Sequence, residues 1–264
     1  MKNSIIKNNI LIYALLGITA DDSQENAVRK IAREAYLTMC RTINYDKSVT
    51  DEDKNKAFLS VCEEIIEALK KMQTEYNNAF KEANSELKNS KHTIGDIRKQ
   101  QAQVLQSSFD KIHKTTCDNI IERFSVCSLT YGQAQKWFNI TLKYIASIDF
   151  EQFTNDDAVE NFLYFHNETI SVLHAPVDSY IIEAVWDENA TAESSPLPLI
   201  KENLLKSGRC GKCSSDKVKP WSKWGHKEYF KFQKYLRENF GNEIGSSLFE
   251  WENNIWIEMS EKKK

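Results

Sequence analysis

Residues 50–73 read TDEDKNKAFLSVCEEIIEALKKMQ and predict a long amphipathic helix. Thr50 and the three acids that follow it are typical of a helix N-terminus, because their oxygens cap free backbone N–H groups and their charge suits the helix dipole. The apolar residues then recur at helical spacing. They are Phe58, Val61, Cys62, Ile65, Ile66 and Leu69. No helix breaker appears before Asn89 and Ser90, so we expect this helix to be unusually long.

Helical patterns continue on both sides of this stretch. Upstream, Asp21–Ser23 can cap a helix that runs to about Ile43. Downstream, a helix starts near Thr93 with an apolar stripe, and a short separate helix surrounds residues 120–124. The stripe consists of Ile97, Val104, Leu105, Phe109 and Ile112. Further helices are expected at about 131–147, 155–166, 177–187, 197–206, 226–239 and 246–258, with an exposed loop over 208–223.

The composition agrees with an all-α protein. The chain has 264 residues but only 8 glycines and 4 prolines, too few turn-forming residues for a many-stranded sandwich or barrel. With 41% apolar residues the chain can bury a core, which excludes disorder as its main state. We expect two helical parts, residues 1–128 and residues 129–264. The apolar run at residues 10–17 is too short to span a membrane and is expected to form a buried first helix rather than a cleaved leader.

Charge is distributed very unevenly along the chain. The formal net charge of −3 excludes a protein that is basic overall. Residues 201–240, however, contain eleven Lys and Arg against four acids, whereas residues 145–193 contain eleven acids and no Lys or Arg. The basic segment could bind nucleic acid or an acidic protein, and the acidic segment could bind a basic protein.

The six cysteines do not form the framework of a small disulfide-rich protein. We therefore expect reduced thiols and a cytoplasmic location. The sequence Cys210-Gly-Lys-Cys213 resembles half of a zinc-binding motif, but a structural zinc site needs four ligands and no second half is present. We predict no metal site and no cofactor.

Two stretches carry the residues with chemical potential. The first is TYGQAQKWFN at residues 130–139, where Thr130 can cap a helix, Gly132 permits a close approach, and Lys136 lies on the first turns. The second is HAPVDSYII at residues 174–182, where Pro176 begins a helix and Asp178 falls in its first turn. Taken separately, Lys136 is typical of a solvated helix lysine, and Asp178 of a partner of the helix dipole.

Together these stretches resemble helix-hairpin-helix DNA glycosylases, and in particular the 8-oxoguanine DNA glycosylase branch. The resemblance covers about fifty residues, and Ala134 stands where that family has a second glycine. It implies that Lys136 is an amine nucleophile that attacks the sugar C1′ and forms a Schiff base. It also implies that Asp178 activates the lysine and stabilises positive charge on the sugar. The two side chains should then share one pocket, lined by an aromatic ring such as Trp137 or Trp224.

The same resemblance and the basic segment identify candidate contacts with nucleic acid. Gly132 would approach a phosphate, and Gln133 and Gln135 would contact base edges, although amides at such positions are more often polar surface. In the basic segment, cations alternate with aromatic rings that could stack on a displaced base. The candidates there are Lys219, Trp221, Lys223 and Trp224.

The leading hypothesis is thus a DNA-binding protein that excises a damaged or modified base. One alternative is a non-catalytic helical protein with an interaction, defence or regulatory role. Another retains the fold and binds a base without excising it. The separation of Lys136 from Asp178 in the folded chain distinguishes these hypotheses, because only an enzyme of this type requires the two side chains to meet.

Overall fold

The structure is a computed structural model and describes residues 13–19, 21–89, 94–148, 150, 161–186, 195–198, 218–241 and 248–262. The described residues are all-helical, with one isolated bridge at Val218. The helices, in chain order, are α2 (Gln24–Met39), η1 (Cys40–Thr42), α3 (Asp51–Asn89), α4 (Ile94–Arg123), α5 (Tyr131–Ala146), α6 (Asn167–Ser171), α7 (Ser179–Val185), η4 (Trp221–Lys223), α9 (His226–Phe240) and α10 (Leu248–Glu261).

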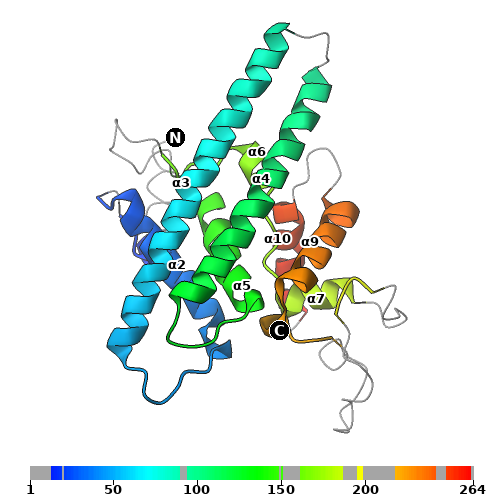
Figure 1. The fold of residues 1–264 in the computed structure, drawn as a ribbon. Helices are drawn as coiled ribbons and strands as arrows, with labels where there is room; N and C mark the ends of the chain where they lie inside the picture. The colour runs from blue at the N-terminus through cyan, green and yellow to red at the C-terminus, as the bar shows by residue number, and fades with distance from the viewer. Residues whose placement is uncertain are drawn as a thin grey trace.

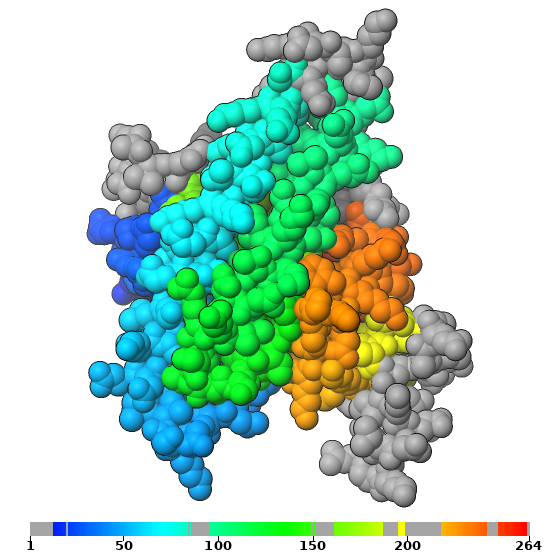
Figure 2. Space-filling model, viewed as in Figure 1, coloured from blue at the N-terminus to red at the C-terminus, as the bar shows by residue number. Residues whose placement is uncertain are grey.

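Two long helices, α3 and α4, form an antiparallel hairpin whose upper end projects beyond the rest of the protein (Figures 1 and 2). At 39 residues, α3 is about 58 Å long at the usual helical rise. The apolar stripe predicted for α3 faces the core, and Val61, Cys62 and Ile65 are fully buried. The expectation of one long helix over this stretch is confirmed.

The short helix α5 lies in the interior and connects the hairpin to the rest of the fold. Trp137 and Phe138 are fully buried, and the indole N–H of Trp137 donates to the Ala32 carbonyl of α2 at 2.8 Å. A single hydrophobic core includes residues from α2 through to Leu248 of α10. The predicted division between residues 128 and 129 therefore passes through a shared core.

Several expected elements differ from the structure. Helix α4 continues unbroken to Arg123, because Ile120 extends the same buried stripe as Ile112, and the separate helix predicted at 120–124 does not exist. Val104 was expected in that stripe but is 43% exposed. The expected helix at 177–187 is shorter and spans only α7.

Other predictions fall partly outside the described residues. Of the expected helices at 155–166 and 197–206, the described parts, residues 161–166 and 197–198, are not helical. In the predicted loop at 208–223, the described end contains η4. At the N-terminal end of the described chain, residues 13–16 are helical, but Tyr13 and Leu15 are 62% and 71% exposed, so this part of the expected buried helix is not buried.

Candidate functional site

The N-terminus of α5 is fixed by a reciprocal cap. The Thr130 hydroxyl accepts from the Gln133 N–H at 3.2 Å, and the Gln133 side-chain oxygen accepts from the Thr130 N–H at 2.9 Å. The Gln133 amide also donates to the Thr42 carbonyl at 2.7 Å, which ties α5 to η1. Gln133 is 5% exposed and its side chain is occupied by these contacts, so it does not present an edge for reading bases.

Gly132 serves a close approach between two segments of the protein itself. Its N–H donates to the Trp224 carbonyl at 2.9 Å, and a Cβ at this position would lie 1.9 Å from the Trp221 carbonyl oxygen. Only glycine fits without displacing the backbone, because real Cβ atoms do not approach an oxygen so closely. The predicted phosphate contact at Gly132 is therefore corrected: the backbone of η4 occupies that place.

Lys136 and Asp178 are 42 positions apart in the sequence, and their side chains are in contact, as the resemblance predicts. The Lys136 ammonium lies 3.2 Å from Asp178 Oδ2, and the two side chains are 9% and 12% exposed. Asp178 is the N-cap of α7, and its Oδ1 accepts from the Tyr180 and Ile181 N–H groups at 2.9 and 3.2 Å. The carboxylate thus holds the helix with one oxygen and the lysine with the other.

The aromatic ring beside this pair is neither of the two that were expected. The Lys136 ammonium lies 4.7 Å from the centre of the Trp221 ring, a favourable cation–π distance. Trp137 is turned toward α2, and Trp224 is 1% exposed, with its indole N–H on the Lys219 carbonyl at 2.8 Å. Trp224 is therefore a core residue. The ring that lies against the lysine belongs to Trp221, which was predicted as a contact with nucleic acid.

Gln135 positions the loop that carries Asp178. Its side chain accepts from the Val177 N–H and donates to the Val177 carbonyl, both at 3.3 Å. The amide thus pairs with this backbone as a neighbouring β-strand does. It also donates to the Gly132 carbonyl at 2.9 Å and is fully buried. The predicted base contact of Gln135 is corrected, because this amide lies inside the protein and its hydrogen bonds join α5 to the residue before Asp178.

A second buried ion pair involves Lys143, seven residues after Lys136 on α5. The Lys143 ammonium is 2.6 Å from Glu252 Oε2 of α10, with side-chain exposures of 16% and 1%. Burial raises the pKa of Glu252, while the nearby Lys143 ammonium opposes the change. Sequence reasoning missed this pair, since nothing in the local pattern of either helix relates residues 109 positions apart.

Of the remaining predicted contacts with nucleic acid, two are lysines near η4. The Lys219 ammonium pairs with Glu228 at 2.7 Å, and that pair is about one-third exposed. Lys223 is exposed and has no ion-pair partner among the described residues. It lines a polar cavity of about 590 Å³ with Ser222, Thr130 and the loop around Asp46. Its contact with nucleic acid stays a prediction.

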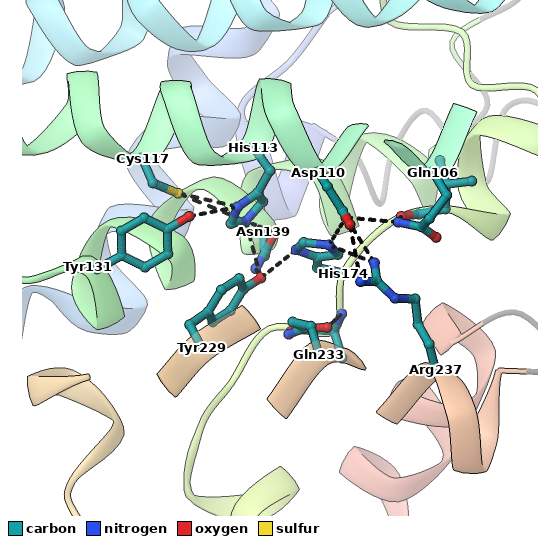
Figure 3. Close-up of polar contacts among 12 residues, drawn as sticks. Gln106, Asp110, His113, Cys117, Tyr131, Asn139, His174, Tyr229, Gln233 and Arg237 are labelled. Carbon is teal, nitrogen blue, oxygen red and sulfur yellow. Dashed lines mark hydrogen bonds and ion pairs between the residues drawn. The ribbon is translucent and has the colours of Figure 1, made fainter. Parts of the chain in front are cut away.

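A buried network of polar side chains, unforeseen in the sequence, lies next to α5 (Figure 3). Its members come from α4, α5, α9 and the loop before α7. They are Gln106, Asp110, His113, Cys117, Tyr131, Asn139, His174, Tyr229, Gln233 and Arg237. On α4 and α9 they recur at spacings of three or four residues, which places them on one face of each helix. Polar residues at that spacing beside the apolar stripe of α4 are the signal that could have indicated them.

One end of the network is anchored by an ion pair. Arg237 donates to both oxygens of Asp110 at 2.9 and 3.2 Å, and His174 Nε2 lies 2.8 Å from Asp110 Oδ1. Burial alone would raise the pKa of Asp110, but the hydrogen bonds and charges of His174 and Arg237 outweigh it and hold that pKa well below its usual range. Asp110 is therefore an acceptor, and His174 Nε2 carries the proton.

The position of that proton determines which groups donate and which accept in the rest of the network. His174 Nδ1 then accepts, so the Tyr229 hydroxyl 2.8 Å away donates to it. The Tyr229 oxygen is free to accept from the Asn139 amide at 2.8 Å, and His113 Nε2 shares its proton between the Tyr229 oxygen at 3.1 Å and Asn139 Oδ1 at 3.0 Å. His113 Nδ1 in turn accepts from the Tyr131 hydroxyl at 3.2 Å. Alternating imidazoles and phenols thus donate in one direction, toward Asp110.

Burial keeps this network uncharged apart from its anchor. Burial lowers the pKa of His113 well below its ordinary value, and His174 adds to the effect. Burial also lowers the pKa of His174, although Asp110 opposes the change. The pKa of Tyr229 is raised well above its ordinary value by burial. At neutral pH the network therefore consists of neutral rings beside one ion pair.

The described residues contain no group of three or more His, Cys, Asp or Glu side chains that could hold a metal ion. Cys40, Cys62, Cys117 and Cys127 are free thiols. Cys210 and Cys213 lie outside the described residues, as do long parts of the acidic and basic segments. Among the helices that are described, none combines the length and apolar character needed to cross a bilayer.

No family model, curated protein or solved structure matches this chain.

Proposed function

We propose that this protein binds DNA and excises a damaged or modified base through a Schiff base on Lys136. The observation that supports the proposal is the buried contact of the Lys136 ammonium with Asp178 at 3.2 Å. An amine and a carboxylate in contact, under an aromatic ring and largely shielded from water, are the parts that nucleophilic displacement of a base requires. The resemblance to helix-hairpin-helix glycosylases supplies the substrate class.

The proposed reaction begins with a proton transfer from Lys136 to Asp178. The neutral amine then attacks the sugar C1′, the bond from C1′ to the base breaks, and the base leaves with the electron pair and takes up a proton. The substituted amine loses a proton, and the C1′–O4′ bond opens with protonation of O4′. The product is a protonated Schiff base between Nζ and C1′. Asp178 supplies the proton that the departing base takes up, and its carboxylate, charged again, balances the positive charge that develops on the sugar.

The proposal also requires that Trp221 move away from Lys136. Its ring lies 4.7 Å from the ammonium and is only partly buried. Trp221 belongs to the three-residue helix η4, whose backbone accepts from the Thr130 hydroxyl and lies against Gly132, so the movement involves the tryptophan side chain. In the proposed complex, the substrate takes over the contact that Trp221 makes with the ammonium.

The test is trapping with borohydride, which reduces a Schiff base to a stable amine. The full-length protein is incubated with duplexes that carry an abasic site or one of a panel of oxidised and alkylated bases. We expect a covalent adduct that Lys136→Gln abolishes. Asp178→Asn should slow its formation strongly, because asparagine retains the oxygen that caps α7 but loses the charge.

The control removes the neighbouring ion pair as a whole. The double substitution Lys143→Gln and Glu252→Gln eliminates an equally buried ammonium on the same helix, and it should leave trapping by the folded protein intact. Equal losses in the control and in Lys136→Gln would show that trapping depends only on the integrity of α5, and absence of any adduct across the panel would refute the enzymatic proposal.

A second candidate is a non-catalytic helical protein. It is favoured by the burial of both members of the pair and by the internal hydrogen bonds of Gln133 and Gln135, which are those of a stable interior. In this case Lys136 and Asp178 join α5 to α7 and no adduct forms. Binding of damaged DNA without an adduct would instead indicate a module that recognises a base and leaves it in place.

A further inference from the structure

An open groove of about 740 Å³ runs between α4 and α9, next to the buried network. The two helices lie beside each other on the face shown in Figure 2, α4 in green and α9 in orange. Six residues of α4 line the groove at helical spacing, and three residues of α9 face them. The lining consists of Gln103, Gln106, Ser107, Asp110, Lys111, Lys114, His226, Lys227 and Phe230.

The groove favours a negatively charged ligand. Lys111 and Lys227 are exposed, lie on opposite walls, and have no ion-pair partner among the described residues. Lys114 adds a third ammonium, although it also contacts Asp118 at 2.8 Å. The one acid in the lining, Asp110, is already neutralised from below by Arg237, which donates to both of its oxygens. Charge complementarity thus points to an anion such as phosphate.

The groove also offers an aromatic ring and amide groups. Phe230 is partly exposed and is held at its inner side by edge-on contacts with His113, His174 and Tyr229, with ring centres 5.4–6.0 Å apart. Gln103, Gln106 and Ser107 supply hydrogen-bonding groups on the facing wall. Cations together with an exposed ring are the combination that binds single-stranded nucleic acid, because phosphates pair with the cations and bases stack on the ring.

We propose that this groove binds an unpaired nucleotide of a DNA strand, with its phosphates against Lys111, Lys114 and Lys227 and its base against Phe230. The inference takes its ligand class from the proposed function, but it does not depend on the chemistry of Lys136. A volume of about 740 Å³ accommodates one nucleotide. The groove binds the strand and does not react with it.

The first test measures the salt dependence of binding. Fluorescein-labelled oligothymidylate is titrated with the full-length protein, and its anisotropy is followed over a range of salt concentrations. The double variant Lys111→Gln and Lys227→Gln should bind more weakly, and its slope of log affinity against log salt should be less steep by about 1.4, which is two phosphate contacts on a single strand. The matched control, Lys56→Gln with Lys71→Gln, removes two exposed lysines of α3 that do not line the groove.

The second test concerns the ring. Phe230→Leu removes the stacking surface but retains an apolar side chain, and a thermal melt confirms that it folds. We expect the affinity for the strand to fall roughly fivefold to a hundredfold. Competition with polyglutamate tests the alternative of an acidic protein partner, which would bind through the lysines and be indifferent to Phe230→Leu.

The outcomes separate this proposal from the enzymatic one. Loss of borohydride trapping in Lys136→Gln with unchanged strand binding is expected if both proposals hold. No trapping in the native protein, with groove-dependent binding intact, would refute the glycosylase and leave the groove. Equal slopes for the groove and control variants, or an affinity insensitive to Phe230→Leu, would overturn the groove as a nucleotide site. Competition by thymidine monophosphate as effective as competition by the strand would assign the groove to a free nucleotide instead.

Discussion

Two buried polar regions lie on neighbouring faces of α5, and they differ in how the cost of burying polar groups is compensated. One consists of complete charges in pairs, Lys136 with Asp178 and Lys143 with Glu252. The other consists of neutral rings and amides that share protons along a chain ending at Asp110. Charges are costly to bury and are retained where chemistry or specificity needs them, whereas neutral networks rigidify a core. Around one helix, buried polar groups are therefore compensated either by an opposite charge or by shared hydrogen bonds.

The largest effect is expected when one member of a charged pair is removed. Glu252→Gln leaves the Lys143 ammonium buried without its carboxylate, which should lower the free energy of unfolding by about 3–5 kcal/mol in urea denaturation. The control is Glu258→Gln on the same helix, whose ion pair with Lys262 has the same 2.6 Å separation but is more than half exposed. That change should stay within about 0.5 kcal/mol. Similar losses in both variants would show that burial does not distinguish the pairs.

A change of pH should act on the neutral region. His113 and His174 have lowered pKa values in the folded protein, so the unfolded chain binds more protons below pH 6.5 and stability falls as the pH falls. Between pH 7 and pH 5 the free energy of unfolding should decrease by about 2–4 kcal/mol for the two histidines together. His226→Gln, at an exposed position, should leave this dependence unchanged. A flat stability profile over this range would mean that the two imidazoles bind protons as readily in the folded protein as in the unfolded chain.

The smallest effect is expected from removing one hydroxyl of the network. Tyr229→Phe leaves His174 Nδ1 without a partner and removes one of the two acceptors of the Asn139 amide, which should cost about 1–3 kcal/mol of stability in chemical denaturation. Tyr235→Phe is the control on the same helix, because its hydroxyl makes no hydrogen bond with the described residues. If the two variants were equally stable, the Tyr229 hydroxyl would not hold the network together.

Local patterns predicted the parts of this fold that local physics determines. The long α3 followed from its cap and its apolar stripe, and the N-terminus of α5 followed from Thr130. The contact between Lys136 and Asp178 is different in kind. No helical or strand period relates two residues so far apart, and it was expected only because the two motifs resemble those of a family in which they meet.

The missed features share a common cause. Gln135 was interpreted as surface or as a base contact because an amide is usually exposed, but hydrogen bonds to Val177 compensate for its burial. The same holds for Asp110, whose partner Arg237 lies on another helix. Whether a polar residue can be buried depends on a distant partner, and that information is absent from the residue's own neighbourhood in the chain.

The direction of donation in the network from Tyr131 to Asp110 has a consequence for its motion. If the Tyr229 hydroxyl turned its hydrogen toward His113, that hydrogen would face the proton on His113 Nε2, and the Tyr229 oxygen would face the lone pair of His174 Nδ1. The Tyr229 hydroxyl therefore keeps one orientation for as long as His174 carries its proton on the nitrogen that faces Asp110.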